Sequence, residues 1–256
     1  MTRPATTRSG RRARYGIDAP VVPAALGAAA VAFVVVGVVT GAVALVVIGV
    51  IFAIETAVFF YATLRGKFLV WQRLLDQLAL RGDEQIADLG CGRGAVLIAA
   101  ARRLDRGTVH GIDVWRTVDQ SGNGEAVTRA NAEAEGVADR VELHTADLRD
   151  LPLPDGLMDV VLSSIAIHNL RDASDRSRAI DEAIRVLAPR GRLVIADIRA
   201  TGAYAERLRA AGLDDVRVAG AGPGFWFSGP WQGVKVVTAT KPAGHPPSAS
   251  DVTAAS

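Results

Sequence analysis

The sequence predicts an α/β fold with a doubly wound, mostly parallel seven-stranded sheet, preceded by two transmembrane helices. From residue 84 onward, short apolar runs alternate with stretches of helical periodicity, which is typical of parallel strands joined by helices. Before that point, residues 20–64 contain a single charged side chain, Glu55. The chain therefore divides into an apolar N-terminal part and an α/β domain.

The composition of the 256 residues fits this division. Half of the residues are hydrophobic and 22% are charged, and the positive mean hydropathy of +0.23 indicates that apolar residues are concentrated in one region. One cysteine, Cys91, excludes an internal disulfide and a cysteine-rich zinc site. Residues 1–17 hold five arginines and no acid, which leaves 24 basic and 27 acidic residues elsewhere. We therefore expect no nucleic-acid partner for the folded domain.

The apolar part is long enough for a membrane hairpin. A helix crosses a bilayer with about 20 apolar residues, and residues 21–40 and 43–64 each satisfy this length. Gly41 between them tolerates the backbone angles of a tight turn. Basic residues flank both ends of the pair, with the arginine arm before it and Arg65 and Lys67 after it. The positive-inside rule then predicts a cell (inner) membrane location with both termini and the α/β domain in the cytoplasm.

Two alternatives to a retained hairpin fit the residues less well. A cleaved signal peptide has an apolar core of about 7–15 residues, whereas the apolar run continues for about twenty residues beyond the possible cleavage site at residues 42–44. A buried helical hairpin of a soluble protein would need a polar face, which is missing here. For Glu55, a substrate role and a packing role against the partner helix both remain open.

The elements after the hairpin follow from periodicity. Residues 68–80 are expected to form a helix, because Phe68 and Trp71 begin an apolar face that would rest at the membrane interface or pack on the domain. Strands are expected at 85–89, 108–112, 140–144, 158–163, 192–196, 216–218 and 233–239, and helices at 95–104, 125–135, 174–187 and 204–211. The predicted organisation is a basic cytosolic arm (1–19), a two-helix transmembrane hairpin (20–64), a connecting helix (65–83), the α/β domain (84–241) and a disordered tail (242–256).

A glycine-rich loop carries the clearest functional signal. The sequence DLGCGRG occupies residues 88–94, between an expected strand and an expected helix. Glycines let a ligand approach the backbone closely, and we expect free N–H groups at the start of the helix. Gly90, Gly92 and Ala95 also satisfy the dinucleotide-binding pattern, and Asp113 suits a ribose hydroxyl in either case. The residues alone therefore leave the type of nucleotide cofactor open.

The loop and four later segments resemble class I S-adenosylmethionine-dependent methyltransferases. DLGCGRG resembles the first motif of that family, and the other segments follow in the family's order. They are GID at 111–113, ADL at 146–148, LPLPDGLMDVV at 151–161 and RVLAPRGRL at 185–193. One departure is Arg190, which stands where the family commonly has glycine. The resemblance covers about residues 80–240 and implies a Rossmann-like methyltransferase fold with S-adenosyl-L-methionine as cofactor.

The resemblance also implies roles for individual residues. Asp88 would lie near the amino group of the cofactor, Asp113 would bind both ribose hydroxyls, and Asp147 would accept from the adenine amine, with Val114 and Leu148 flanking the ring. The complete set of implied cofactor-binding residues is Asp88, Gly90, Cys91, Gly92, Gly94, Asp113, Val114, Asp147, Leu148 and Ser163. No metal is expected.

The methyl acceptor is expected near residues 163–170. His168 is the best candidate for a catalytic base, because an imidazole exchanges protons near neutral pH; alternatively, it only hydrogen-bonds the loop or the cofactor. Residues 115–123 and 222–231 are candidates for a cofactor cap and a substrate rim, or for ordinary turns.

Together these observations predict a membrane-anchored S-adenosylmethionine-dependent methyltransferase that acts on a small, possibly lipophilic acceptor. The alternatives are a cofactor-binding membrane module without catalysis and an NAD-dependent oxidoreductase.

Overall fold

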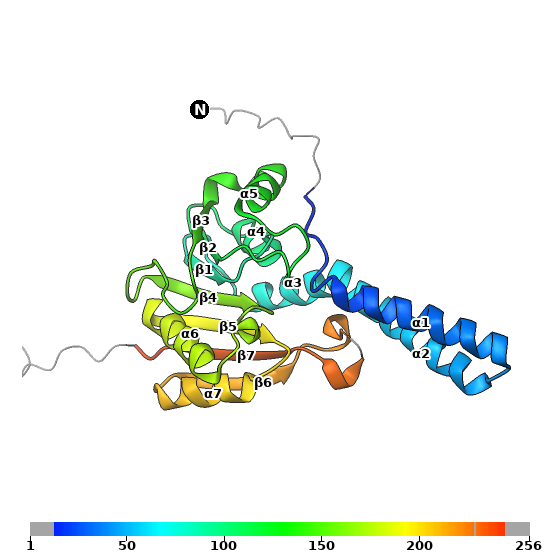
Figure 1. The fold of residues 1–256 in the computed structure, drawn as a ribbon. Coiled ribbons are helices and arrows are strands. Elements are labelled where there is room, and N and C mark those ends of the chain that lie inside the picture. The colour runs from blue at the N-terminus through cyan, green and yellow to red at the C-terminus, as the bar shows by residue number, and fades with distance from the viewer. Residues whose placement is uncertain (1–12, 228, 244–256) are drawn as a thin grey trace, which may run out of the picture.

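The structure is a computed structural model that describes residues 13–227 and 229–243 (Figure 1). An α/β domain carries a long helical hairpin that projects from one side. The hairpin consists of α1 (Val21–Thr40) and α2 (Val43–Tyr61). The predictions for the arm before residue 13 and for residues 244–256 of the tail lie outside the described residues.

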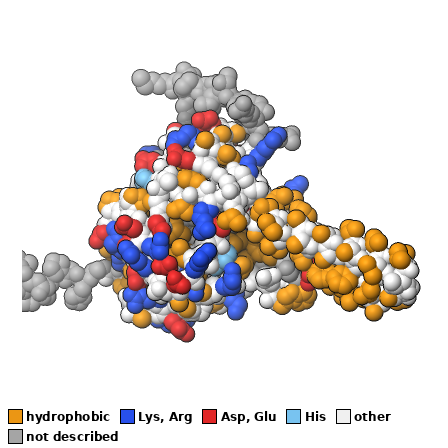
Figure 2. All heavy atoms as spheres, viewed as in Figure 1, with side chains coloured by type: hydrophobic (Ala, Val, Ile, Leu, Met, Phe, Trp, Pro, Cys, Tyr) orange, Lys and Arg blue, Asp and Glu red, His pale blue; other side chains and the backbone are white. Residues whose placement is uncertain are grey.

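The first helix and the turn of the hairpin lie where the sequence predicts them, whereas α2 ends at Tyr61, three residues before the predicted end. Gly41 has a φ of +72°, so it adopts the left-handed conformation that the turn requires. The helices pack along their length, with the rings of Phe33 and Phe52 stacked at 5.7 Å. By length and composition both helices could cross a membrane. Their outer side chains are exposed, including Val39 at 80% and Val43 at 74%, and Figure 2 shows the resulting hydrophobic rod.

The second helix of the hairpin continues without a break into the next helix, although the sequence predicts two separate helices here. A π-helical turn (η1, Ala62–Gly66) joins α2 directly to α3 (Lys67–Gln77). At this turn Gly66 contacts the backbone of Gly224, and a Cβ on Gly66 would overlap the Gly224 carbonyl oxygen. The close backbone contact and the π-turn therefore occur together, where the hairpin meets the domain.

α3 packs on the domain, which decides between the two alternatives for its apolar face. Trp71 is only 2% exposed, and its indole Nε1–H donates to Ser164 Oγ at 2.8 Å. Leu75, one turn further, is fully buried in the same core.

The seven-stranded sheet has the order β3-β2-β1-β4-β5-β7-β6, which confirms the predicted fold class. Strands β1 to β5 are parallel, and β7 runs antiparallel to both of its neighbours. The strands are β1 (Gln85–Leu89), β2 (Thr108–Asp113), β3 (Val141–Thr145), β4 (Met158–Ser164), β5 (Leu187–Asp197), β6 (Asp214–Gly220) and β7 (Lys235–Thr240).

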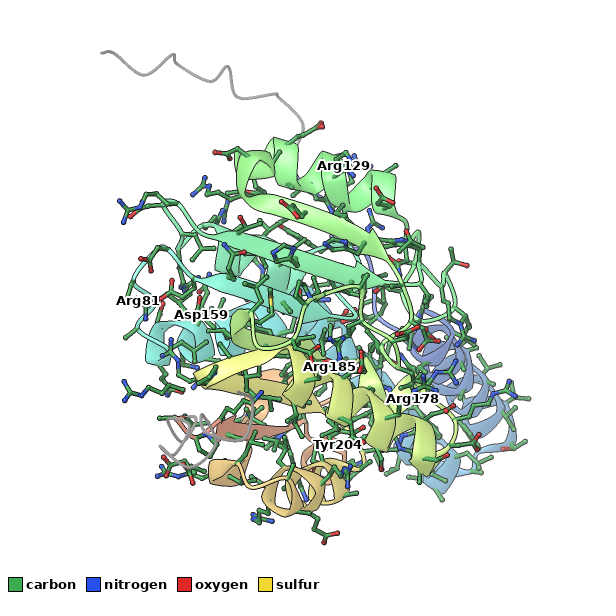
Figure 3. All side chains as sticks on the ribbon, turned by 90° about the vertical axis from the view of Figure 1, so that its left-hand side faces the viewer. Arg81, Arg129, Asp159, Arg178, Arg185 and Tyr204 are labelled. Carbon is green, nitrogen blue, oxygen red and sulfur yellow. The ribbon has the colours of Figure 1, made fainter. Side chains whose placement is uncertain are left out.

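Helices cover both faces of the sheet and enclose two hydrophobic cores. Residues of α3, α4 and α5 contribute to one core, and residues of α6 and α7 to the other; in Figure 3, Arg185 and Tyr204 mark α6 and α7. The helices of the domain are α4 (Ala95–Ala101), α5 (Glu125–Ala134), α6 (Ala173–Val186) and α7 (Thr201–Ala210), with short 3₁₀ turns η2 (Ala138–Arg140), η3 (Ile167–Asn169), η4 (Pro223–Phe225) and η5 (Pro230–Gln232). Residues 146–157, between β3 and β4, contain no helix.

β5 starts five residues earlier than expected, directly after α6. The segment contains Arg190, which has a φ of +63° and donates its N–H to Lys241 O at 2.9 Å. The turn thus keeps the left-handed backbone conformation that glycine would adopt without strain. A non-glycine residue such as Arg190 adopts this conformation at an energetic cost.

Candidate functional site

A cavity of about 550 Å³ lies beyond the carboxyl ends of the central strands. This is where doubly wound sheets bind ligands, and the volume falls within the range of about 300–1,000 Å³ of ligand pockets. It brings together most of the predicted site residues: Asp88, Gly90, Cys91, Gly92, Asp113, Val114, Asp147, Leu148 and His168.

Two predicted cofactor residues, Gly94 and Ser163, are not among the described residues that line the cavity. Gly94 instead precedes α4 with a φ of +85°. Ser163 is fully buried in β4, and its hydroxyl donates to Leu89 O at 2.8 Å, which ties β4 to β1. The next residue, Ser164, lines the cavity instead.

The backbone N–H groups of residues 90–94 in the glycine loop all donate to acceptors within the protein. Gly90 has a φ of +75°, and a Cβ on it would overlap the Cβ of Ala166, so the loop approaches the β4 end as closely as glycine allows. The amides donate from Gly90 and Cys91 to Ile112 O, from Gly92 to Asp113 Oδ2, from Arg93 to Gln120 Oε1 and from Gly94 to Cys91 O.

Asp88 is a buried carboxyl group without a partner. It is 1% exposed, and neither oxygen has a hydrogen-bond partner among the described residues. Burial raises its pKa to about 7, with the backbone N–H of Leu97 opposing the shift and the negative charge of Asp113 adding to it. Burial and the same two carboxylates raise the pKa of the Cys91 thiol, which keeps it protonated and unsuited to nucleophilic attack.

The carboxylate of Asp113 already accepts hydrogen bonds from the two neighbouring loops. Its Oδ2 accepts from the Gly92 amide at 2.8 Å, while Oδ1 accepts from the Trp115 amide at 2.6 Å and from Asn123 Nδ2 at 3.3 Å. A carboxylate offers about four lone-pair sites. One position therefore remains, where the resemblance implies two hydrogen bonds to a ribose.

Asp147 is paired with a residue that sequence reasoning missed. Arg149 donates to both of its carboxylate oxygens, with Nε at 2.9 Å from Oδ1 and Nη2 at 2.7 Å from Oδ2. These hydrogen bonds lower the pKa of Asp147. Arg149 also reaches Asp175 at 2.9 Å, so it links the rim of the cavity to α6.

His168 forms a dyad with Asp197, the last residue of β5. His168 Nδ1 lies 2.5 Å from Asp197 Oδ1 without the geometry of a hydrogen bond, and the Asp197 side chain is fully buried. Asp197 accepts from the amides of His168 and Ile198 and from the Tyr204 hydroxyl. Burial and the negative charge of Asp197 raise the pKa of Tyr204, which keeps the phenol a donor. The predicted strand ends one residue before Asp197, so the sequence analysis missed this residue. An acid at the end of a strand could have indicated it as a site residue.

Part of the cavity lining is apolar, and the base of the hairpin contributes to it. Phe59 of α2 packs against Phe227 with ring centroids 5.1 Å apart, so the glycine- and aromatic-rich segment before β7 contacts the hairpin. Glu55 is not among the described residues that line the cavity. The apolar part of the lining contains Val22, Phe59, Phe68, Trp71, Ile165 and Phe227.

Residues 14–19, which we call the strap, lie along another side of the cavity. Asp18 lines the cavity and accepts from Lys67 Nζ at 2.7 and 3.0 Å, from Thr63 Oγ1 at 2.7 Å and from Gln120 Nε2 at 3.0 Å. Lys67 is 5% exposed, so Asp18 neutralises a buried charge that the sequence alone places at the membrane surface. The loop of residues 115–123 also lines the cavity, and it contacts the strap through Gln120.

Comparison with known proteins identifies the α/β domain. Residues 87–195 match the family described as "Methyltransferase domain". The chain is 35% identical over 172 residues to 27-O-demethylrifamycin SV methyltransferase of Amycolatopsis mediterranei, which covers 64% of this chain and 57% of that protein. It is 34% identical over 131 residues to demethylmenaquinone methyltransferase of Thermus thermophilus, covering 51% and 54%. The chain spans about half the length of these curated relatives.

Solved structures share the fold. The crystal structure of the [4+2]-cyclase SpnF matches with a TM-score of 0.53 at 25% identity, over 68% of this chain and 82% of that one. The ordered motifs, the strand order and the match over residues 87–195 agree, and they decide against a nicotinamide-binding domain. The α/β domain of this chain belongs to the class I S-adenosylmethionine-dependent methyltransferases.

Proposed function

We propose that the chain is a membrane-anchored methyltransferase that transfers a methyl group from S-adenosylmethionine to a small lipophilic acceptor. The observation that carries this proposal is the composition of the cavity. Its lining includes the glycine loop with Asp88 and Asp113 as well as apolar side chains, some of which come from the base of the hairpin. The cavity could therefore hold a charged nucleotide and an apolar molecule side by side.

The residues present fit the cofactor. S-adenosylmethionine supplies a methyl group on a positively charged sulfur and carries an amino group. The unpartnered carboxylate of Asp88 is suited to bind that amino group, because a buried acid gains most from a cationic donor. Asp113 has one position left for a ribose hydroxyl. Asp147, held by Arg149, and the apolar Val114 and Leu148 would surround the adenine.

His168 is assigned as the base that receives a proton from the acceptor. Nδ1 faces the Asp197 carboxylate, which leaves Nε2 as the nitrogen available to an acceptor hydroxyl or amine. Tyr204 and two backbone amides hold Asp197 in turn, so the imidazole is oriented by a fixed carboxylate.

The exposed hydrophobic surface of α1 and α2 supports the membrane anchor. Each helix has the length of about 20 residues that a bilayer requires, and an apolar rod of this size is untenable in water. The strap and the domain contact each other, so both lie at the same end of the hairpin. With the flanking basic residues, this arrangement favours a cytoplasmic domain. Val22 and Phe59 line the cavity at the root of the rod, which gives a lipophilic acceptor a path from the bilayer.

The activity is tested with the full chain in lipid nanodiscs, given S-adenosylmethionine and a lipid extract. We expect an extract component to gain the mass of one methylene group and S-adenosylhomocysteine to accumulate in equal amount. Product of unchanged mass would favour a reaction such as that named for the [4+2]-cyclase, and no turnover despite cofactor binding would favour a non-catalytic module.

The anchor is tested separately. A reporter active only outside the cytoplasm should be active after Thr40 and inactive at the C-terminus. Recovery of the full chain from the membrane by alkaline carbonate would contradict the spanning hairpin and leave the methyl-transfer proposal intact.

A further inference from the structure

A second cluster of ligating side chains lies outside the cavity, on neighbouring strands β2 and β3. His110 of β2 pairs in register with Glu142 of β3, and His144 lies two residues further along β3, so the three share one face of the sheet. His110 Nδ1 lies 3.2 Å from His144 Nε2 and 3.4 Å from Glu142 Oε2. The three ligand atoms all lie within 4.8 Å of one another.

The tautomer of His110 is set by a fourth residue. Its Nε2 lies 3.1 Å from Gln85 Oε1, which only accepts, so Nε2 carries the proton and the lone pair of Nδ1 faces the cluster. Gln85 is itself fixed, because its amide donates to Asp159 Oδ2 at 2.9 Å (Asp159 is labelled in Figure 3). A hydrogen-bonded partner that orients a ligating histidine in this way is the usual support of a metal site.

We propose that His110, Glu142 and His144 bind a Zn²⁺ ion. Zinc bonds of about 2.0–2.1 Å to nitrogen place the corners of a tetrahedron about 3.3–3.4 Å apart, which matches both contacts of His110 Nδ1. Two histidines and one glutamate leave the fourth corner to water or to another donor, and the 61% exposed Glu142 side chain shows that solvent reaches it.

The ion would join the edge strand β3 to β2 on a face where the connection to β4 has no helix to cover it.

The test uses the full chain without an affinity tag, stripped with a chelator in detergent micelles and titrated with Zn²⁺ by calorimetry. We expect one ion per chain, at least ten-fold weaker binding in His144→Ala and in Glu142→Gln, and about 10–100-fold weaker binding in Gln85→Leu. His168→Ala is the matched control, since it removes a histidine elsewhere and should leave zinc affinity unchanged.

Cobalt gives a second readout. Co²⁺ in the wild-type chain should show the strong visible absorption of a tetrahedral site, and this absorption should be absent in His144→Ala. Unchanged S-adenosylmethionine affinity in His144→Ala confirms that the variant is folded. No saturable zinc binding, equal binding in wild type and His144→Ala, or loss of binding in His168→Ala would each overturn the proposal.

Discussion

Replacing Asp88 with asparagine should stabilise the ligand-free protein and weaken its cofactor binding. Burial raises the pKa of Asp88 from 3.8 to about 7. A shift of about three units corresponds to a cost of about 4 kcal/mol for the charged form in the folded state. Because the unfolded chain loses this proton near pH 4 and the folded chain only near pH 7, stability falls as pH rises between these values and stays low above them.

Asparagine removes the charge but leaves an unpaired amide, which costs about 1–3 kcal/mol. The expected net gain of Asp88→Asn is therefore about 1–3 kcal/mol at pH 8, and it disappears at pH 5, where Asp88 is protonated in the folded chain. Thermal unfolding of the full chain in detergent, followed by tryptophan fluorescence at pH 5, 6, 7 and 8, measures this. An unchanged difference between the two proteins across that pH range would refute the buried charge.

Proton release on binding provides the second measurement. At pH 7 about half of the free Asp88 carries a proton, and binding of a cationic amino group should remove it. Calorimetry in two buffers of different ionisation enthalpy should thus show about 0.5 more protons released by wild type than by Asp88→Asn. Equal release with equal S-adenosylmethionine affinity would refute the assignment of Asp88 to the amino group.

Four further substitutions test the rest of the site and the junction between the hairpin and the domain. Asp113→Asn should weaken S-adenosylmethionine binding by about 1–3 kcal/mol, and unchanged affinity by calorimetry would remove the ribose assignment. His168→Ala should lower kcat about 10²–10⁴-fold with cofactor affinity retained, and Asp197→Asn should lower kcat in the same direction; normal turnover of both variants would leave the dyad a structural role. Gly66→Ala should lower the unfolding temperature by overpacking against Gly224, at a cost of about 1–3 kcal/mol, whereas the exposed Gly202→Ala serves as the control.

The parts of the fold that could be predicted depend on local patterns. The strands of the parallel sheet follow from short apolar runs, and the glycine loop with Asp88 and Asp113 follows from adjacent motifs. The ends of strands do not follow from apolar periodicity in the same way. β5 ends at Asp197, a polar residue that the apolar pattern leaves outside the strand.

The contacts that could not be predicted join residues far apart in the chain. Lys67 marks a membrane boundary by its charge, yet it is buried by Asp18, 49 residues earlier. The acceptors of two glycine-loop amides are also distant: Asp113, in the following strand, accepts from Gly92, and Gln120, in the loop after it, accepts from Arg93. Pairings of this kind depend on which segments meet in space, and no local spacing in one sequence encodes them.

The strap has a consequence for the order in which the protein is completed. Its residues are made first, but their partners follow much later: Asp18 bonds Gln120, 102 residues on, and Arg14 bonds Asn131, 117 residues on. At about 5–20 residues per second, a ribosome takes about 5–20 s to supply them. During this interval both apolar helices have left the ribosome while the cavity still lacks a wall. The cofactor site is therefore completed only after the hairpin has had time to insert into the membrane.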